Sequence, residues 1–133
     1  MTSAVLVGIF GISGALLRFA TDSWFALHSS RRTVRLGLSK DRLHWPWATL
    51  VVNVAGSFII GVSYGLTTQL GLGHEWSIGL GTGLAGGLTT FSSWTTATVR
   101  LLGESRFGAA AMNIAVNLVL GLGAAAAGIA LVS

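Results

Sequence analysis

Residues 86–94, with the sequence GGLTTFSSW, interrupt an otherwise apolar segment in the second half of the chain. Two glycines followed by two threonines disfavour a continuous helix, because glycine costs about 1 kcal/mol relative to alanine in a helix. In a membrane, the carbonyl groups freed by such a break must be buried in protein or must face water or an ion. Unwound carbonyls and threonine hydroxyls form hard-oxygen cation sites in proteins with discontinuous helices. We therefore expect a broken helix with a cation site; a glycine kink that serves only helix packing is the alternative.

The interrupted segment is the third of four that are long and apolar enough to cross a membrane. A transmembrane helix needs about 20 residues at a rise of 1.5 Å each. The four segments are about residues 4–27, 47–67, 76–102 and 107–132. The tryptophans at their edges, where indole rings favour the interface, are Trp24, Trp45, Trp47 and Trp76. The sequence thus predicts an all-α integral membrane protein, a single transmembrane domain over residues 1–133 with four transmembrane helices, of which the third is broken.

The composition indicates lipid as the surrounding solvent. Of the 133 residues, 52% are hydrophobic and 9% are charged, with a mean hydropathy of +0.74, whereas soluble domains carry about 25% charged residues. The net charge of +4 does not indicate nucleic-acid binding, because five of the eight basic residues fall between Arg31 and Arg42, as in a cytoplasmic membrane loop. The absence of cysteine excludes disulfides and thiol chemistry. No basic residue precedes the first apolar run, so we expect no cleaved signal peptide.

Glycine is abundant within the spans. The chain has 19 glycines, and the pairs Gly61/Gly65 and Gly83/Gly87 have GxxxG spacing. Small residues let helix backbones approach closely in lipid, where apolar burial drives little association. We expect four tightly packed helices that enclose little space, so a transport pathway through so small a protein requires an oligomer.

One nucleotide-binding pattern is a decoy. Residues 81–86 match GxGxxG, and Glu104 lies downstream. The dinucleotide fingerprint requires a preceding strand in a βαβ unit, but here it lies within a hydrophobic helix. No GxxxxGK[ST] pattern is present, so the chain encodes no ATP-driven pump.

Two pairs of polar residues lie on single helix faces within the spans. Asn53 and Ser57 in the second span, and Asn113 and Asn117 in the fourth, are each spaced i, i+4. Hydrogen bonding between helices explains either pair alone. Together with the Ser/Thr-rich third span, the two faces favour an uncharged polar pathway.

The motifs around these residues resemble the CrcB/Fluc family of small fluoride channels. Residues 14–19, GALLRF, are similar to the motif of the family's first helix. Residues 46–58, PWATLVVNVAGSF, are similar to its PxGTLxVNxxGSF motif, with Ala48 where glycine is usual. Residues 86–94 are similar to its GGLTTFSTF signature, and the fourth helix has the family's spaced polar residues.

The resemblance implies an antiparallel dimer with a structural sodium ion at the centre, held by the carbonyls of Gly86 and Thr89. It also implies two narrow pores that flank the ion, with Phe91 and the aromatic residue three positions later presenting ring edges to fluoride. Other residues implied in the fluoride pathway are Asn53, Ser57, Thr90, Ser92, Asn113 and Asn117. Trp94 departs from the family, which has phenylalanine there, and its larger indole would alter or block a pore.

The chemistry agrees with a passive fluoride exporter. Fluoride is strongly hydrated, and aromatic ring edges together with Ser, Thr and Asn donors can replace its water. The runner-up is a four-helix multidrug/proton antiporter, which needs a membrane carboxylate. Asp22 is the only candidate, and an ion pair with Arg18 is its expected role. A non-transporting assembly subunit would not explain the interruption. An enzyme is not expected, since His28, His44 and His74 lie in predicted loops or at span edges.

The distribution of basic residues predicts the orientation in a bacterial inner membrane. The first and third loops, with adjoining helix ends, hold seven of the eight basic residues: Arg31, Arg32, Arg35, Lys40, Arg42, Arg100 and Arg106. Excess Lys/Arg in short loops marks the cytoplasmic side, so we expect both termini outside. A chain that inserts in one orientation needs an oppositely oriented homologous subunit to form an antiparallel dimer. We therefore favour a heterodimer over a homodimer.

Overall fold

The structure, a computed structural model, describes residues 2–37 and 45–133. This part of the chain is helical and contains no strand. Its elements are α1 (Thr2–Leu36), α2 (Trp47–Leu70), α3 (His74–Ile78), the π-helical segment η1 (Gly79–Ala85), α4 (Gly86–Leu88), α5 (Phe91–Gly103) and α6 (Phe107–Val132).

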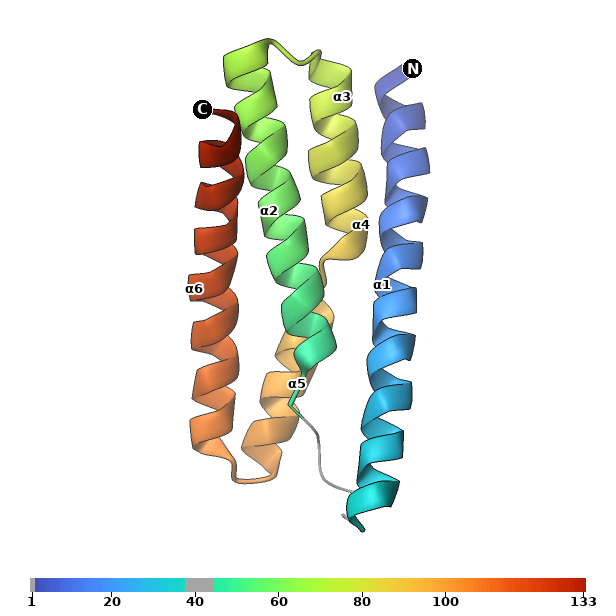
Figure 1. Ribbon diagram of the computed structural model, residues 1–133, viewed down its shortest axis with the longest axis vertical. Helices are drawn as coiled ribbons and strands as arrows, with labels where there is room; N and C mark the ends of the chain where they lie inside the picture. The colour runs from blue at the N-terminus through green and yellow to red at the C-terminus, as the bar shows by residue number, and fades with distance from the viewer. Residues whose placement is uncertain (1, 38–44) are drawn as a thin grey trace.

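The helices form an elongated bundle in which both ends of the chain lie at the same end (Figure 1). α2 and α6 lie side by side, and α3, η1 and α4 follow one another between α2 and α1. α5 continues towards the other end and packs against α6. The last turn of α1, the first turn of α2 and the turn between α5 and α6 therefore lie at the same end of the bundle, opposite the termini (Figure 1).

By length and composition, α1, α2 and α6 are each able to cross a membrane. The segment predicted as the third span, residues 76–102, corresponds to α3, η1, α4 and α5, none of which is long enough alone. A bilayer core of about 30 Å needs about 20 helical residues. The predicted third span therefore consists of several shorter elements.

Glycines hold α2 against α6. A Cβ added at Gly61 would overlap the backbone of Ala125. From the other side, a Cβ at Gly128 would overlap the Phe58 carbonyl and would lie 2.8 Å from the amide nitrogen of Val62. Real Cβ atoms do not approach backbone so closely, so the two helices pack at a distance that only glycine permits.

The second GxxxG pair has the same role between α1 and the third segment. A Cβ at Gly83 would lie 3.0 Å from the Val7 carbonyl oxygen, and one at Gly87 would overlap the Gly11 carbonyl. Gly14 on α1 approaches the carbonyl of Leu84 in return. The first half of α1 is thus fixed to η1 and α4, whereas α1 makes no contact with α5 in the described part of the chain.

The first helix is longer than predicted. The sequence placed the end of the first span near residue 27 and a loop from His28 to Trp45, but α1 continues to Leu36. The segment contains no glycine or proline before Gly37, whose left-handed φ of 60° ends the helix. Arg31, Arg32 and Arg35 therefore lie on a helix, not in a loop. Lys40, Arg42 and His44 lie outside the described residues.

Candidate functional site

The third segment changes direction at two threonines. Thr89 (φ −74°, ψ 159°) and Thr90 (φ −147°, ψ 114°) have extended backbone and separate α4 from α5. Gly86 and Gly87 remain helical, in α4. The residues that leave the helix are thus the β-branched ones, which suit extended backbone, and Gly87 serves the close approach of α1.

Side chains take the amide donors that a continuous helix would use here. The Thr90 amide donates to Oδ1 of Asn53 at 2.8 Å; in a continuous α-helix it would donate to the Gly86 carbonyl. The Ser93 amide donates to Oγ1 of Thr90 at 3.1 Å, which makes Thr90 the N-cap of α5. That amide would otherwise reach the Thr89 carbonyl. The carbonyls of Gly86 and Thr89 therefore lose their usual helical donors.

The guanidinium of Arg18 reaches the interruption. Its Nη1 donates to the Thr89 carbonyl at 3.3 Å. The predicted ion pair between Arg18 and Asp22 is therefore wrong: the one ion pair found among the described residues joins Arg106 and Glu104, and the Asp22 side chain is exposed. The two helices meet at Gly14, and this brings Arg18, one turn further along α1, next to Thr89.

Asparagines connect the interruption to α6. Nδ2 of Asn53 donates to the Thr90 carbonyl at 3.3 Å and to Oδ1 of Asn117 at 3.2 Å. Nδ2 of Asn117 donates to Oδ1 of Asn113 at 3.1 Å, and Nδ2 of Asn113 donates to Oγ1 of Thr98 at 3.0 Å. Within the described residues, every buried side-chain nitrogen and oxygen has a partner. The network is fully satisfied inside one chain, as a fixed polar core should be.

Trp94 belongs to this buried side. Its Nε1 donates to the Asn113 carbonyl at 3.2 Å. Its ring meets that of Phe91 edge to face, with centroids 5.6 Å apart and planes at 70°. Phe91 itself is 72% exposed. The tryptophan therefore braces α5 against α6, and the phenylalanine one turn earlier points out of the chain.

The remaining predicted pathway residues lie on either side of the network. Ser57 and Asn117 share the wall of an open cavity of about 230 Å³ between α2 and α6. Ser92 is exposed, and its hydroxyl lies 3.3 Å from that of Thr90. Gly86 is also exposed; a Cβ there would have only the Gly81 carbonyl oxygen nearby, at 4.0 Å.

Four contributors were not predicted as site residues, and one of them is Ser93, whose amide donates to Oγ1 of Thr90. Arg18 and Gly56 both lie in the quoted motifs, and a Cβ at Gly56 would overlap the methyl group of Thr89. Thr98 accepts the last hydrogen bond of the asparagine chain. No sequence signal marks Thr98, because a threonine one turn after Trp94 reads as an ordinary position on a helix.

This geometry is typical of one class of protein. A multi-pass helical membrane protein that gathers its polar side chains at an interrupted helix has the arrangement by which channels and transporters line an ion path. The matching decoy pattern, residues 81–86, lies on η1 and α4 with no strand before it in the described chain.

Comparison with known sequences identifies the family. The profile of the CrcB-like proteins, described as Camphor Resistance (CrcB), matches residues 5–129, and the chain belongs to this family. A protein of Renibacterium salmoninarum named fluoride-specific ion channel FluC is 46% identical over 127 residues, covering 96% of both chains. A Pseudomonas putida protein of the same name is 39% identical, covering 98% of this chain and 95% of its own. Fluoride-specific ion channel FluC 1 of Symbiobacterium thermophilum is 35% identical, covering 97% and 96%.

Proposed function

We propose that this chain is a subunit of a fluoride-specific ion channel and that it carries no catalytic activity. The observation that carries the proposal is the satisfied polar network at the helix interruption, found in a chain whose relatives are named fluoride-specific ion channels over nearly their whole length. Every group of that network is an uncharged donor or acceptor. An anion that must shed strongly bound water needs donors along its path, and the groups exposed beside this network can supply them.

Fluoride passes along the outer side of the network. Phe91 is exposed beside the hydroxyls of Ser92 and Ser93, and aromatic ring edges carry partial positive charge. Ser57 and Asn117 line the open cavity between α2 and α6. Asn53 connects the two, because it binds both Thr90 and Asn117. One chain supplies only a wall, so a second subunit must close the pore.

The exposed surface at the interruption supports an antiparallel dimer centred there. Gly86, Ser92, Ser93 and Thr96 are exposed in the single chain, at the middle of the third crossing. Hydroxyl groups at that depth are costly against lipid tails, where no partner can satisfy them fully. A second subunit placed on this face covers them and meets the helix ends of this one.

A structural sodium ion fits the same face. The carbonyls of Gly86 and Thr89 have lost their helical donors to Asn53 and Thr90, and carbonyl oxygens at unwound helices are sodium ligands. The Thr89 carbonyl accepts from Arg18 and still has a second lone pair. Two oxygens are half a site, and an antiparallel partner would contribute the other two.

The charge distribution supports one orientation in a bacterial inner membrane, with both termini outside. Arg31, Arg32, Arg35, Arg100 and Arg106 lie on elements that meet at one end of the bundle (Figure 1), which we call the basic end. An excess of arginine marks the cytoplasmic side. A chain with one orientation pairs with an oppositely oriented homologous subunit. Relatives numbered FluC 1 and FluC 2 are consistent with such pairs, although each name comes from a different bacterium.

The direction of flow follows from the membrane potential. Hydrogen fluoride enters a cell as a neutral molecule and ionises inside. The inside-negative potential then drives the anion outward with about 2.3 kcal/mol per 100 mV. The channel needs no other energy source and lowers the toxicity of fluoride.

Growth on fluoride tests the function and the pairing together. A topology-inverted copy has the five basic residues from Arg31 to Arg42 replaced by glutamine and carries lysine at Ser3, Thr68, Gln69 and Glu75. It is expressed with the natural chain in bacteria that lack their own fluoride channel. We expect resistance to fluoride from the pair and not from either chain alone. Resistance from the natural chain alone would show a dual-topology homodimer. If neither the chain nor the pair confers resistance when both are present in the membrane, the channel function is wrong.

Cysteine labelling tests the orientation separately. The chain has no cysteine, so single cysteines at Ser3 and Ser30, both on α1 at opposite ends, report two sides of the membrane. We expect an impermeant thiol reagent to label only Ser3→Cys in intact cells that express the natural chain. Comparable labelling at both positions would contradict the single orientation and the heterodimer.

A further inference from the structure

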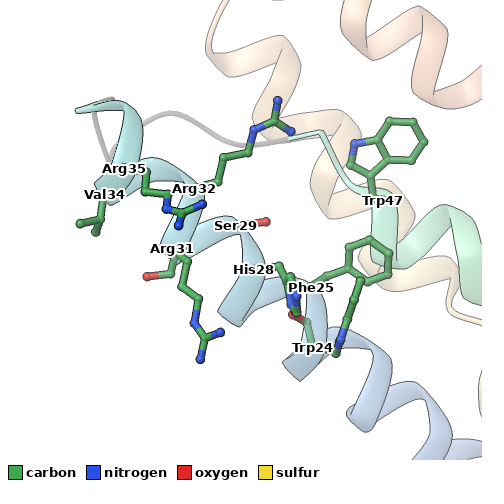
Figure 2. A pocket seen from close by; sticks show the side chains of 10 residues that line it. Trp24, Phe25, His28, Ser29, Arg31, Arg32, Val34, Arg35 and Trp47 are labelled. Atoms are coloured by element: carbon green, nitrogen blue, oxygen red, sulfur yellow. The ribbon is translucent and has the colours of Figure 1, made fainter.

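A cavity lies away from the helix interruption, at the basic end. It has a volume of about 830 Å³ and lies between the last turns of α1 and the start of α2. Cavities of about 300–1,000 Å³ are the usual size of small-molecule sites. Figure 2 shows Arg32 extending from α1 towards the start of α2, where Trp47 stands.

The aromatic and the basic residues that line the cavity occupy successive positions along the axis of α1. Trp24, His28, Arg32 and Arg35 follow one another on one face of α1, because steps of three and four residues return to the same side. Trp24 stacks on His28 with ring centroids 4.0 Å apart, and the ring nitrogen of His28 contacts the Trp24 carbonyl at 3.0 Å. The face therefore begins aromatic and ends cationic, and none of the described residues that line the cavity is acidic.

The depth of this face matches the edge of a bilayer. α1 has 35 residues and is about 52 Å long, which exceeds a hydrocarbon core of about 30 Å. Tryptophan favours the membrane interface, and Trp24 and Trp47 are both about half exposed. Arg31 lies seven residues beyond Trp24, about 10 Å further along the axis. The tryptophans thus lie nearer the hydrocarbon core, and the arginines lie further out, on the headgroup side.

In the described part of the chain, α5 does not cover the last turns of α1. α1 is fixed to η1 and α4 through Gly11 and Gly14, but it does not contact α5. No helix among the described residues therefore packs on the α5 side of the last turns of α1.

We propose that this cavity binds the headgroup and glycerol region of an anionic phospholipid. Arginine donates in a planar fork that matches a phosphate group, and basic pockets between transmembrane helices bind anionic headgroups. Arg31, Arg32 and Arg35 bind the phosphate, and the rings of Trp24 and Trp47 contact the upper acyl chains. The bound lipid neutralises the arginine cluster and fixes the free end of α1. The site rests on the chain spanning a membrane and not on its conducting fluoride.

Native mass spectrometry of the purified protein tests the site. The protein is incubated with phosphatidylglycerol or with phosphatidylcholine, and retained lipids are counted. We expect phosphatidylglycerol to be retained preferentially, and retention to fall at least about fivefold when Arg31, Arg32 and Arg35 are all changed to glutamine. Lysine at the same three positions keeps most of the binding. Arg100→Gln is the control, because Arg100 is exposed near the same end but does not line the cavity.

The following results would contradict the lipid site. Equal retention of the two lipids, or full retention by the glutamine variant, overturns the proposal. Inorganic phosphate at 10 mM, on the order of a cellular concentration, should compete weakly with a lipid that is also held by its acyl chains. If it displaces phosphatidylglycerol, the ligand is a free anion and the proposal is overturned. The channel function is judged separately, by growth on fluoride.

Discussion

Glycine has two opposite roles in this chain. At some positions it allows two helices of the chain to pack closely, and at position 86 it leaves open space on the surface. Between α2 and α6, Gly61 and Gly128 lie against backbone of the facing helix, so no side chain fits. At the interruption, Gly86 is exposed and has open space around it. Nothing inside the chain requires glycine at position 86. The first set therefore builds the bundle, whereas Gly86 lies on the surface on which the second subunit is proposed to pack.

The largest effect of a substitution is expected at the glycines that lie against the backbone of a facing helix. Gly128→Val places a branched side chain against the Phe58 carbonyl and the Val62 amide, and overpacking of this kind costs about 3 kcal/mol or more when the backbone must move. We expect little folded protein, measured as monodisperse yield after extraction. Gly123→Val is the matched control on the same helix, since a Cβ there meets nothing within 4 Å. Equal yields from the two variants would break the comparison.

The next largest effect is expected at Gly86, which is exposed and has open space around it. Gly86→Val should leave the single chain folded, with unchanged helix content by circular dichroism, because a Cβ has space there. Fluoride flux of the assembled channel should fall at least about tenfold, since the side chain lies where the partner and the sodium ion are proposed to sit. Thr89→Ser keeps the carbonyl and should be mild. Normal flux from Gly86→Val would contradict the site.

Phe91 tests the open surface with a smaller change. Phe91→Ile keeps an apolar side chain but removes the ring edge, so we expect throughput to be lost in the pore that this residue lines and the fold to be intact. A matched control is Phe19→Ile, because Phe19 is 70% exposed on α1 and Phe91 is 72% exposed on α5. Flux measured in liposomes should distinguish them. Similar flux from both variants would remove Phe91 from the pathway.

The smallest effect is expected three residues later. Trp94→Phe removes the hydrogen bond to the Asn113 carbonyl, which costs about 1 kcal/mol of stability. Flux should be preserved or raised, because Trp94 lies on the buried side of α5. A lowered midpoint of thermal unfolding with normal flux is the expected pair of results. Abolished flux in a well-folded protein would show that the indole acts in conduction.

The apolar segments and the motif at residues 86–94 predicted the helical fold and most residues that the structure brings together. Hydrophobic length predicts helices well because the bilayer sets it. The sequence did not show that Gly86 and Gly87 stay helical while Thr89 and Thr90 leave the helix. That choice depends on Asn53, which offers the Thr90 amide an acceptor from another helix.

Long-range contacts explain the other differences. Arg18 was paired with Asp22 because the two are one turn apart, but α1 meets the third segment so closely that the guanidinium reaches Thr89 instead. Trp94 was expected to alter or block a pore, and the hydrogen bond from its indole to the Asn113 carbonyl of α6 was not predicted. Charge alone placed Arg31 to Arg35 in a loop, although arginine is a good helix former and no residue there ends a helix.

The most direct test of the account is the release of fluoride and chloride from the same liposomes. The natural chain and its topology-inverted copy are reconstituted together, and both anions are followed with ion-selective electrodes while a potassium gradient sets the potential. The account predicts fluoride release at least about a hundredfold faster than chloride release, lost when both copies carry Gly86→Val and kept when both carry Gly123→Val. Equal release of the two anions, or fluoride release unchanged by Gly86→Val, would contradict it.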